Sequence, residues 1–396
     1  MNPLKHPNIP RLYVIKIVKW FMLVMPIIVL FYQDNGLSME QVFIVQAVFS
    51  VSIVLLEIPS GYLADVWGRK FTLVTGSVLG LAGYLVYCFS YNFRGFIMAE
   101  ITLGIGQSLI SGADSAILYD SLMEQKRQEE YALYEGRVIS LGNFAESVAG
   151  VTGGLLAGIS LRTPFYFQAA VAFLAIPAAL TLTEPERHFL LVKKGFRHIL
   201  SIFKNALWDD PMLRWTILFS AIAGASTLSM AWFVQPFFKA VDIPVPLFGV
   251  LWTVLNLSVG LAALYSYRFS RQLGTSRTLT LFSVGLPLGF VLTGLFPVIW
   301  SLSVLLVFYL IRGIATPVLK ECINRFTGSD VRATVLSVRN FVIRLLFTVL
   351  GPFFGWLADH LSLQHALVTA GIIFFAGLTL SRIFYLKQLS QQKIPE

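Results

Sequence analysis

The sequence predicts an all-α membrane protein with twelve transmembrane helices. Of its 396 residues, 56% are hydrophobic and 13% are charged, whereas soluble domains are about 45–50% apolar and about 25% charged. A helix needs about 20 apolar residues to cross a bilayer, and backbone groups in lipid must pair internally, so apolar runs of this length are helices. Twelve such runs lie at 12–33, 40–62, 71–91, 94–121, 132–158, 163–183, 212–237, 246–267, 277–296, 298–322, 332–357 and 363–385.

The basic residues predict the orientation of these helices. With the N-terminus inside the cell, eighteen Lys and Arg residues fall in cytoplasmic segments, and only Arg94, Arg162 and Lys239 fall outside. Cytoplasmic loops carry an excess of Lys and Arg. Both termini are therefore expected in the cytoplasm, and the first apolar run lacks the small-residue cleavage site of a signal peptide.

Several function classes are not supported. The net charge of +9 is spread over short loops, whereas a nucleic-acid-binding protein gathers its basic residues on one soluble face. The two cysteines, Cys88 and Cys322, lie in or near apolar runs without metal-like spacing, so neither a disulfide framework nor a metal site is expected. No Gly-Lys-Ser/Thr phosphate-binding loop is present. We expect no enzyme, no cofactor and no nucleic-acid partner.

The two halves of the chain repeat. An offset of 201 aligns Gly112 with Gly313 and Asp120 with Glu321, and an offset of 202 aligns Arg137 with Arg339. The long polar stretch between the halves, which carries apolar residues at helical spacing, predicts an amphipathic helix on the inner leaflet. The predicted organisation is a six-helix bundle at 1–183, a cytoplasmic amphipathic linker at 184–211, and a second six-helix bundle at 212–396.

A short charged segment between the second and third runs resembles a known loop signature. Residues 61–70 read Gly-Tyr-Leu-Ala-Asp-Val-Trp-Gly-Arg-Lys. They are similar to the Gly-x-Leu-Ala-Asp-x-x-Gly-Arg-Lys loop that the major facilitator superfamily carries between helices 2 and 3. Residues 271–274 look like a decayed copy of 65–68. The resemblance implies the family's fold, in which two pseudo-symmetric six-helix bundles enclose a substrate site at the membrane midplane.

Ionisable residues inside the runs are the candidate functional residues, because a charge at a helix centre costs about 2.5–3.5 kcal/mol on insertion scales. On the fourth run, Glu100, Gln107 and Asp114 are spaced by seven residues and share one face. Basic and polar residues recur every four residues on the tenth and eleventh runs, which favours an anionic substrate. The alternatives are a structural hydrogen-bonded seam, and neutralisation of the cations by Asp114 and Glu146. The predicted substrate-cavity residues are Glu100, Gln107, Asp114, Arg312, Thr316, Asn340 and Arg344.

Proton coupling is predicted from the deep carboxylates. Burial can raise the pKa of a carboxyl group by up to about 3–5 units, which brings proton exchange close to neutral pH. On this basis Asp114 is the first candidate and Glu146 the second.

A second set of residues, near the cytoplasmic ends of the helices, is predicted to control gating rather than substrate contact. Asp65, Arg69 and Asp120 resemble the charge network that the superfamily's loop makes with the end of helix 4. The repeat suggests two matching ion pairs, Asp120–Arg137 and Glu321–Arg339. The predicted gating residues are Gly61, Asp65, Gly68, Arg69, Asp120, Arg137, Glu321 and Arg339.

The fifth run, 132–158, only partly resembles the antiporter signature that the drug-exporting branches of the superfamily carry on helix 5. Its Gly150 stands where that signature has proline, and Glu100 stands where those branches have arginine. Small residues at such spacing also allow close helix packing. The closer match to the signature, at 351–355, lies on the eleventh run.

The resulting prediction is a secondary transporter, similar to drug and metabolite exporters, that moves a small organic solute by alternating access. Proton-coupled efflux (antiport) is preferred. A proton-coupled importer or facilitator of an organic anion is the first alternative, and a transporter-like receptor or lipid-handling protein is the second. We expect a monomer in a bacterial inner membrane, with the solute, protons and membrane lipid as its partners.

Overall fold

A computed structural model describes residues 7–184, 201–328 and 331–391, which are helical and contain no strand. The helices of the first half are α1 Asn8–Trp20, α2 Ile28–Asp34, α3 Met39–Trp67, α4 Arg69–Phe89, α5 Phe93–Glu124, η1 Gln128–Glu130, α6 Tyr131–Ala157, α7 Thr163–Phe173 and α8 Ala175–Leu180. Those of the second half are η2 Asn205–Asp209, α10 Pro211–Ala240, α11 Val245–Leu273, α12 Thr275–Leu295, α13 Ser301–Arg325, α14 Arg332–His360 and α15 Leu363–Gln391.

The helix lengths confirm the predicted fold class. Ten segments of the described chain are long and apolar enough to cross a membrane: α3, α4, α5, the continuous pair α7–α8, and α10 to α15. The other two predicted spans are α6, which carries several charged residues, and the segment that contains α1 and α2. The twelve predicted spans therefore all correspond to helical segments.

The first predicted span, 12–33, is not one continuous helix. Residues 21–27 are non-helical and separate α1 from α2. Pro26 lies in this break and disfavours helical geometry at the residue before it. Irregular backbone is tolerated at membrane depth only where protein buries it. Here the buried side chain of Gln168 accepts the Leu23 N–H (2.7 Å).

The charged segment at 61–70 is more compact than a loop. Helix α3 continues to Trp67 and α4 begins at Arg69, so the two helices are separated by Gly68 alone. Gly68 has a φ of 107°, which glycine adopts without steric cost. Its repeat mate Gly274, between α11 and α12, has a φ of 75°. Thr72 and Thr278 each donate a side-chain hydrogen bond of 2.8 Å to the carbonyl of the respective glycine, which confirms the repeat at this position.

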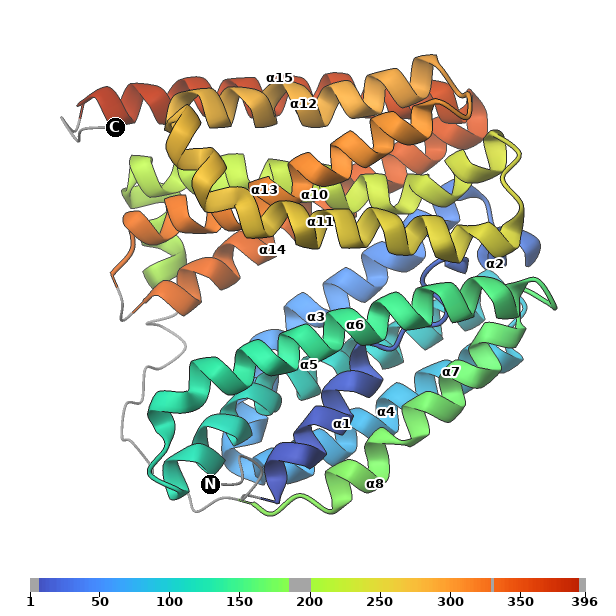
Figure 1. Ribbon diagram of the computed structural model, residues 1–396, viewed down its shortest axis with the longest axis vertical. Coiled ribbons are helices and arrows are strands. Elements are labelled where there is room, and N and C mark those ends of the chain that lie inside the picture. The colour runs from blue at the N-terminus through green and yellow to red at the C-terminus, as the bar shows by residue number, and fades with distance from the viewer. Residues whose placement is uncertain (1–6, 185–200, 329–330, 392–396) are drawn as a thin grey trace. The chain divides into compact units, whose positions relative to one another are not determined.

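The chain forms two compact units. Unit 1 comprises Met1–Leu37, Ile44–Leu190 and Pro244–Thr253, and unit 2 comprises Ser38–Phe43, Leu191–Ile243 and Val254–Glu396. Within unit 1, α4 packs along α5, and within unit 2, α12 packs along α15 (Figure 1). The start of α3 thus clusters with unit 2, and the start of α11 with unit 1.

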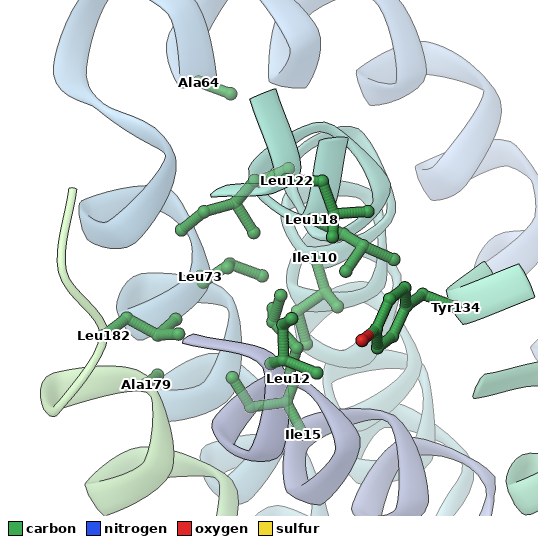
Figure 2. Close-up of a cluster of buried hydrophobic side chains, with 13 residues drawn as sticks. Leu12, Ile15, Ala64, Leu73, Ile110, Leu118, Leu122, Tyr134, Ala179 and Leu182 are labelled. Carbon is green, nitrogen blue, oxygen red and sulfur yellow. The ribbon is translucent and has the colours of Figure 1, made fainter. Parts of the chain in front are cut away.

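Each unit has a hydrophobic cluster near one end. In unit 1, buried side chains from α1, α3, α4, α5, α6 and α8 form one cluster, which includes Leu12, Leu73 and Leu118 (Figure 2). In unit 2, Ile202 and Ala206 pack against side chains of α10, α13 and α14. These two residues belong to the predicted linker, most of which (185–200) lies outside the described residues. The described end of the linker therefore packs on protein, and the prediction of an amphipathic helix on the inner leaflet stays a prediction.

Candidate functional site

A buried carboxylate on α5 lies at the centre of a hydrogen-bonded cluster in unit 1. Oε1 of Glu100 accepts hydrogen bonds from the hydroxyls of Tyr32 (3.0 Å) and Tyr87 and from Nε2 of Gln46 (2.9 Å). The two tyrosine hydroxyls contact each other, and Nε2 of Gln46 lies 3.1 Å from the hydroxyl of Tyr32. All four side chains are buried, with Glu100 only 4% exposed. We call these four residues the Glu100 cluster.

Four helices contribute one residue each to the Glu100 cluster. Tyr32 comes from α2, Gln46 from α3, Tyr87 from the last turn of α4, and Glu100 from α5. Aromatic rings surround it: the rings of Tyr87 and Phe96 stack with centroids 5.6 Å apart. Such rings exclude water, so hydrogen bonds inside the cluster act in a low dielectric.

No cation pairs with Glu100 among the described residues. Arg162 contacts the end of α4 next to Tyr87, and its donors bind groups other than Glu100. Its Nη1 donates to three carbonyl oxygens in the segment Tyr87–Ser90 (2.9–3.2 Å), and its Nη2 donates to Oδ1 of Asn35 (2.6 Å). Arg162 thus satisfies the carbonyls at the C-terminal end of α4 and fixes the backbone of a cluster member.

Asp114, two helical heptads from Glu100 on α5, has a different environment. Its Oδ2 lies 2.6 Å from Nζ of Lys16 and 3.5 Å from Nζ of Lys19, both on α1. The hydroxyl of Ser115 lies 3.3 Å from Oδ1 of Asp114 and 3.2 Å from Oε1 of Glu135 on α6. The carboxylate that the sequence analysis ranked first for proton binding therefore forms ion pairs within its own unit.

The face of α5 predicted from the seven-residue spacing separates into two sites. Glu100 has uncharged partners and Asp114 has charged ones, while Gln107 is half-buried between them. The spacing correctly places these residues on one face. It did not reveal that their partners differ.

The ion pair between Arg69 and Asp120 is present, as the family resemblance implied. Nη1 of Arg69 also donates to the carbonyl of Ala116 (2.8 Å). The predicted pair Asp120–Arg137 is wrong, because Asp120 binds Arg69 and the guanidinium of Arg137 lies over the ring of Tyr134, 5.5 Å from its centroid. Gly68 has a positive φ, whereas Gly61 lies within α3 and the side chain of Asp65 is not among those that the structure describes. The gating role of this network stays a prediction.

Two residues that the sequence analysis missed complete this end of unit 1. The carboxylate of Glu184 accepts the backbone N–H groups of Arg69 (2.8 Å) and Lys70 (2.7 Å), and so caps the N-terminus of α4. The buried Asn8 amide donates to Oγ of Ser121 (2.9 Å) and to the carbonyl of Thr183 (2.8 Å). In the sequence, the position of the polar Asn8 at the edge of an apolar run was the feature that could have indicated this role.

In unit 2, the predicted pair Glu321–Arg339 is also wrong. Glu321 pairs with Arg325 one turn along α13 (2.8 Å). Arg339 is buried instead, where its Nε donates to Oγ of Ser220 (2.5 Å) and its Nη1 to Oδ1 of Asn340 (3.1 Å). The offset of the repeat aligned the right positions, but neighbouring side chains supplied closer partners.

The remaining candidate residues do not converge on one site within a unit. The guanidinium of Arg312 lies 5.3 Å from the ring centroid of Tyr309. The hydroxyl of Thr316 donates to the carbonyl of Arg312 (3.0 Å). Arg344 on α14 and Glu146 on α6 are half-buried. Their assignment to a substrate cavity or to proton coupling stays a prediction.

The glycines of α6 serve close packing within unit 1. A Cβ atom at Gly154 would lie 2.7 Å from the backbone nitrogen of Gly249 at the start of α11, and one at Gly153 would overlap the carbonyl of Leu23 in the break of the first span. A Cβ at Gly150 would lie 2.6 Å from Oγ1 of Thr253. Only glycine fits at these contacts, which is the packing interpretation of this segment.

Comparisons with known proteins agree with this architecture. Residues 17–352 match the family model described as Major Facilitator Superfamily. The chain is 21% identical to Multidrug resistance protein 2 of Bacillus subtilis (strain 168), over 91% of this chain and 90% of that protein. It is 23% identical to Quinolone resistance protein NorA of Staphylococcus aureus (strain MRSA252), over 42% of each chain.

Solved transporter structures have the same fold. The nucleoside transporter NupG matches with a TM-score of 0.78 at 15% identity, over 100% of both chains. The D-xylose-proton symporter matches with a TM-score of 0.71 at 14% identity, over 95% of both chains. At these identities the similarity concerns the fold alone.

Proposed function

Because the chain belongs to the Major Facilitator Superfamily, we propose that it exports a small organic solute in exchange for protons, and that Glu100 binds the proton. Membership of this family makes the protein a membrane transporter. The export direction is supported by relatives whose names refer to multidrug and quinolone resistance. The excess of Lys and Arg in alternate loops supports an orientation with both termini in the cytoplasm.

The Glu100 cluster is the observation that carries the proton-coupling proposal. A buried charge in a membrane helix is costly and is a candidate functional site. The partners of Glu100 are uncharged, so protonation removes its charge without leaving a buried cation unpaired. Protonation of Asp114 would instead leave Lys16 and Lys19 without their carboxylate.

The chemistry of the cluster suits both protonation states. A tyrosine hydroxyl can donate or accept a hydrogen bond. Tyr32 and Tyr87 can therefore donate to the carboxylate of Glu100, and one of them can accept from the carboxylic acid after its hydroxyl hydrogen rotates toward the other. The amide of Gln46 donates in either case. The cluster can thus load and release a proton with small movements of heavy atoms.

The test is transport in everted membrane vesicles, with ethidium and the quinolone norfloxacin as probes. An acid-inside pH gradient should drive uptake of at least one probe into vesicles that contain the wild-type protein. Glu100→Gln keeps the size and hydrogen-bonding groups of the side chain but cannot bind a proton. It should lose gradient-driven uptake and retain exchange of labelled for unlabelled probe.

The matched control is Glu129→Gln, which removes an exposed carboxylate outside the cluster and should leave both activities unchanged. Gradient-driven uptake by Glu100→Gln at the wild-type rate would refute the role of Glu100. Exchange of both probes by the wild-type protein without any response to the pH gradient would refute proton coupling.

A further inference from the structure

Two basic side chains in unit 2 interact electrostatically, and neither has an acidic partner among the residues that the structure describes. Arg339, on α14, is 6% exposed. Lys320, on the last third of α13, is exposed and interacts electrostatically with Arg339. Lys320 lies near the end of α13 and Arg339 near the start of α14, and only residues 326–331 separate these two helices in the chain. Two positive charges therefore lie near this helix connection.

The described acid next to this pair in the chain has another partner. Glu321, next to Lys320 in the chain, forms its ion pair with Arg325. Among the residues that the structure describes, no carboxylate is paired with Arg339 or Lys320. Ser220 and Asn340, the hydrogen-bond partners of Arg339, are uncharged.

This arrangement is unfavourable without a bound anion. A guanidinium group stays protonated in proteins, and burying an ion is costly. The neutral hydrogen bonds to Ser220 and Asn340 offset only part of this cost. The positive charge of Lys320 adds repulsion. An anion that contacts both cations would remove the imbalance.

We propose that Arg339 and Lys320, together with Asn340, form a binding site for a carboxylate or phosphate group. The planar guanidinium can present two parallel N–H donors to such a group, and the ammonium of Lys320 supplies a second charge. Asn340 is exposed and can donate from its amide nitrogen, because its Oδ1 already accepts from Arg339. Ser220 orients the guanidinium from α10.

The site is independent of the proposed proton coupling in unit 1. The same oxyanion chemistry belongs to a free anion and to the headgroup of an anionic lipid, and both would bind these residues. Because Lys320 and Asn340 are exposed, a free anion or a lipid headgroup can reach the buried Arg339 between them.

The test measures thermal unfolding of the purified full-length protein in a non-ionic detergent at constant ionic strength, with sodium phosphate replacing sodium chloride. The second arm compares protein in phosphatidylcholine vesicles with protein in vesicles that contain 30% phosphatidylglycerol. Phosphate, phosphatidylglycerol or both should raise the unfolding temperature of the wild type. Lys320→Gln should weaken the phosphate response at least about tenfold in apparent affinity, and Arg339→Gln should abolish it.

Arg325→Gln is the matched control, because it removes one positive charge from the same end of α13 but outside the proposed site. Its responses should equal those of the wild type. A response to phosphate identifies a free-anion site, and a response to phosphatidylglycerol alone, lost in the same variants, identifies a lipid headgroup site. If Arg339→Gln does not fold, Lys320→Gln decides. The proposal is overturned if neither anion stabilises the wild type, or if Lys320→Gln responds as strongly as Arg325→Gln.

Discussion

The ion-paired Asp114 gives the sharpest stability prediction. Asp114 is 3% exposed, and its partners Lys16 and Lys19 are 12% and 16% exposed, at N–O distances of 2.6 Å and 3.5 Å. Breaking a buried ion pair by removing one partner costs about 3–5 kcal/mol. The long lysine side chains can move toward the surface. We therefore expect Asp114→Asn to lower the free energy of unfolding by about 3 kcal/mol, at the low end of that range.

A double-mutant cycle isolates the interaction. Lys16→Met alone should cost less than Asp114→Asn, because Lys19 still pairs with the carboxylate. The double variant Lys16→Met/Asp114→Asn should recover part of the loss, since fewer unpaired charges remain. The assay is unfolding in mixed micelles with increasing denaturing detergent, followed by tryptophan fluorescence. An Asp114→Asn variant within about 0.5 kcal/mol of the wild type, an effect expected of an ordinary surface substitution, would refute the reasoning.

The same variant separates the two buried carboxylates of α5, Glu100 and Asp114, by function. Folded Asp114→Asn should keep the response of transport to a pH gradient, although its maximal rate can fall with the amount of folded protein. Glu100→Gln should show the opposite pattern. The sequence prediction ranked Asp114 first and Glu146 second as proton sites and did not name Glu100 for this role. We propose Glu100 because its partners are uncharged, whereas Asp114 is paired with two lysines.

Three further changes test other contacts. Asn8→Ala removes buried hydrogen bonds of 2.8–2.9 Å and should cost about 2–4 kcal/mol in the same unfolding assay, at about 1–3 kcal/mol for each unpaired group; a loss below that of an exposed control would contradict it. Gly154→Leu places side-chain atoms on the backbone of α11 and should reduce the folded yield. Gly136→Leu should not, because the space that a Cβ would occupy at Gly136 is open. Equal folded yields would contradict the close packing of α6 on α11 at Gly154. Arg127 lowers the pKa of Glu130 below its ordinary value of 4.5. This pair therefore stabilises the fold above pH 4.5 and loses its effect as the pH falls through the lowered pKa. The difference in unfolding temperature between wild type and Arg127→Gln should shrink from pH 7 to pH 3.5, and a constant difference would exclude this linkage.

The fold was predictable because hydropathy and repetition act over long stretches of chain. Each apolar run is at least about as long as a bilayer crossing, so errors of a few residues at its ends do not change the number of spans. Gly68 and Gly274 were visible as paired loop glycines, and the structure gives both a positive φ. The break in the first span was not predicted, since Pro26 alone does not show whether a helix bends or stops. The outcome depends on Gln168, which lies far away in the sequence and satisfies the exposed backbone.

The partners of the charged residues were less predictable. Asp120 could meet Arg69 or Arg137, and the choice depends on how α4, α5 and α6 are rotated about their axes. A repeat offset compares positions in sequence and contains no information on that rotation. The family resemblance supplied the correct partner for Asp120 through Arg69. No such motif covered Arg339, and its predicted partner was wrong.

Glu100 also permits a direct distinction between a charge kept for stability and one kept for transport. Glutamine at position 100 can still accept from the tyrosines and removes the cost of a buried negative charge. We expect Glu100→Gln to unfold with a free energy within about 1 kcal/mol of the wild type, the net value of one hydrogen bond, or higher. The measurement is the unfolding assay used for Asp114→Asn, and Glu129→Gln is its control. A loss as large as that of Asp114→Asn would mean that the carboxylate itself holds α2, α3 and α4 together, and a structural role would then explain its burial without any proton transfer.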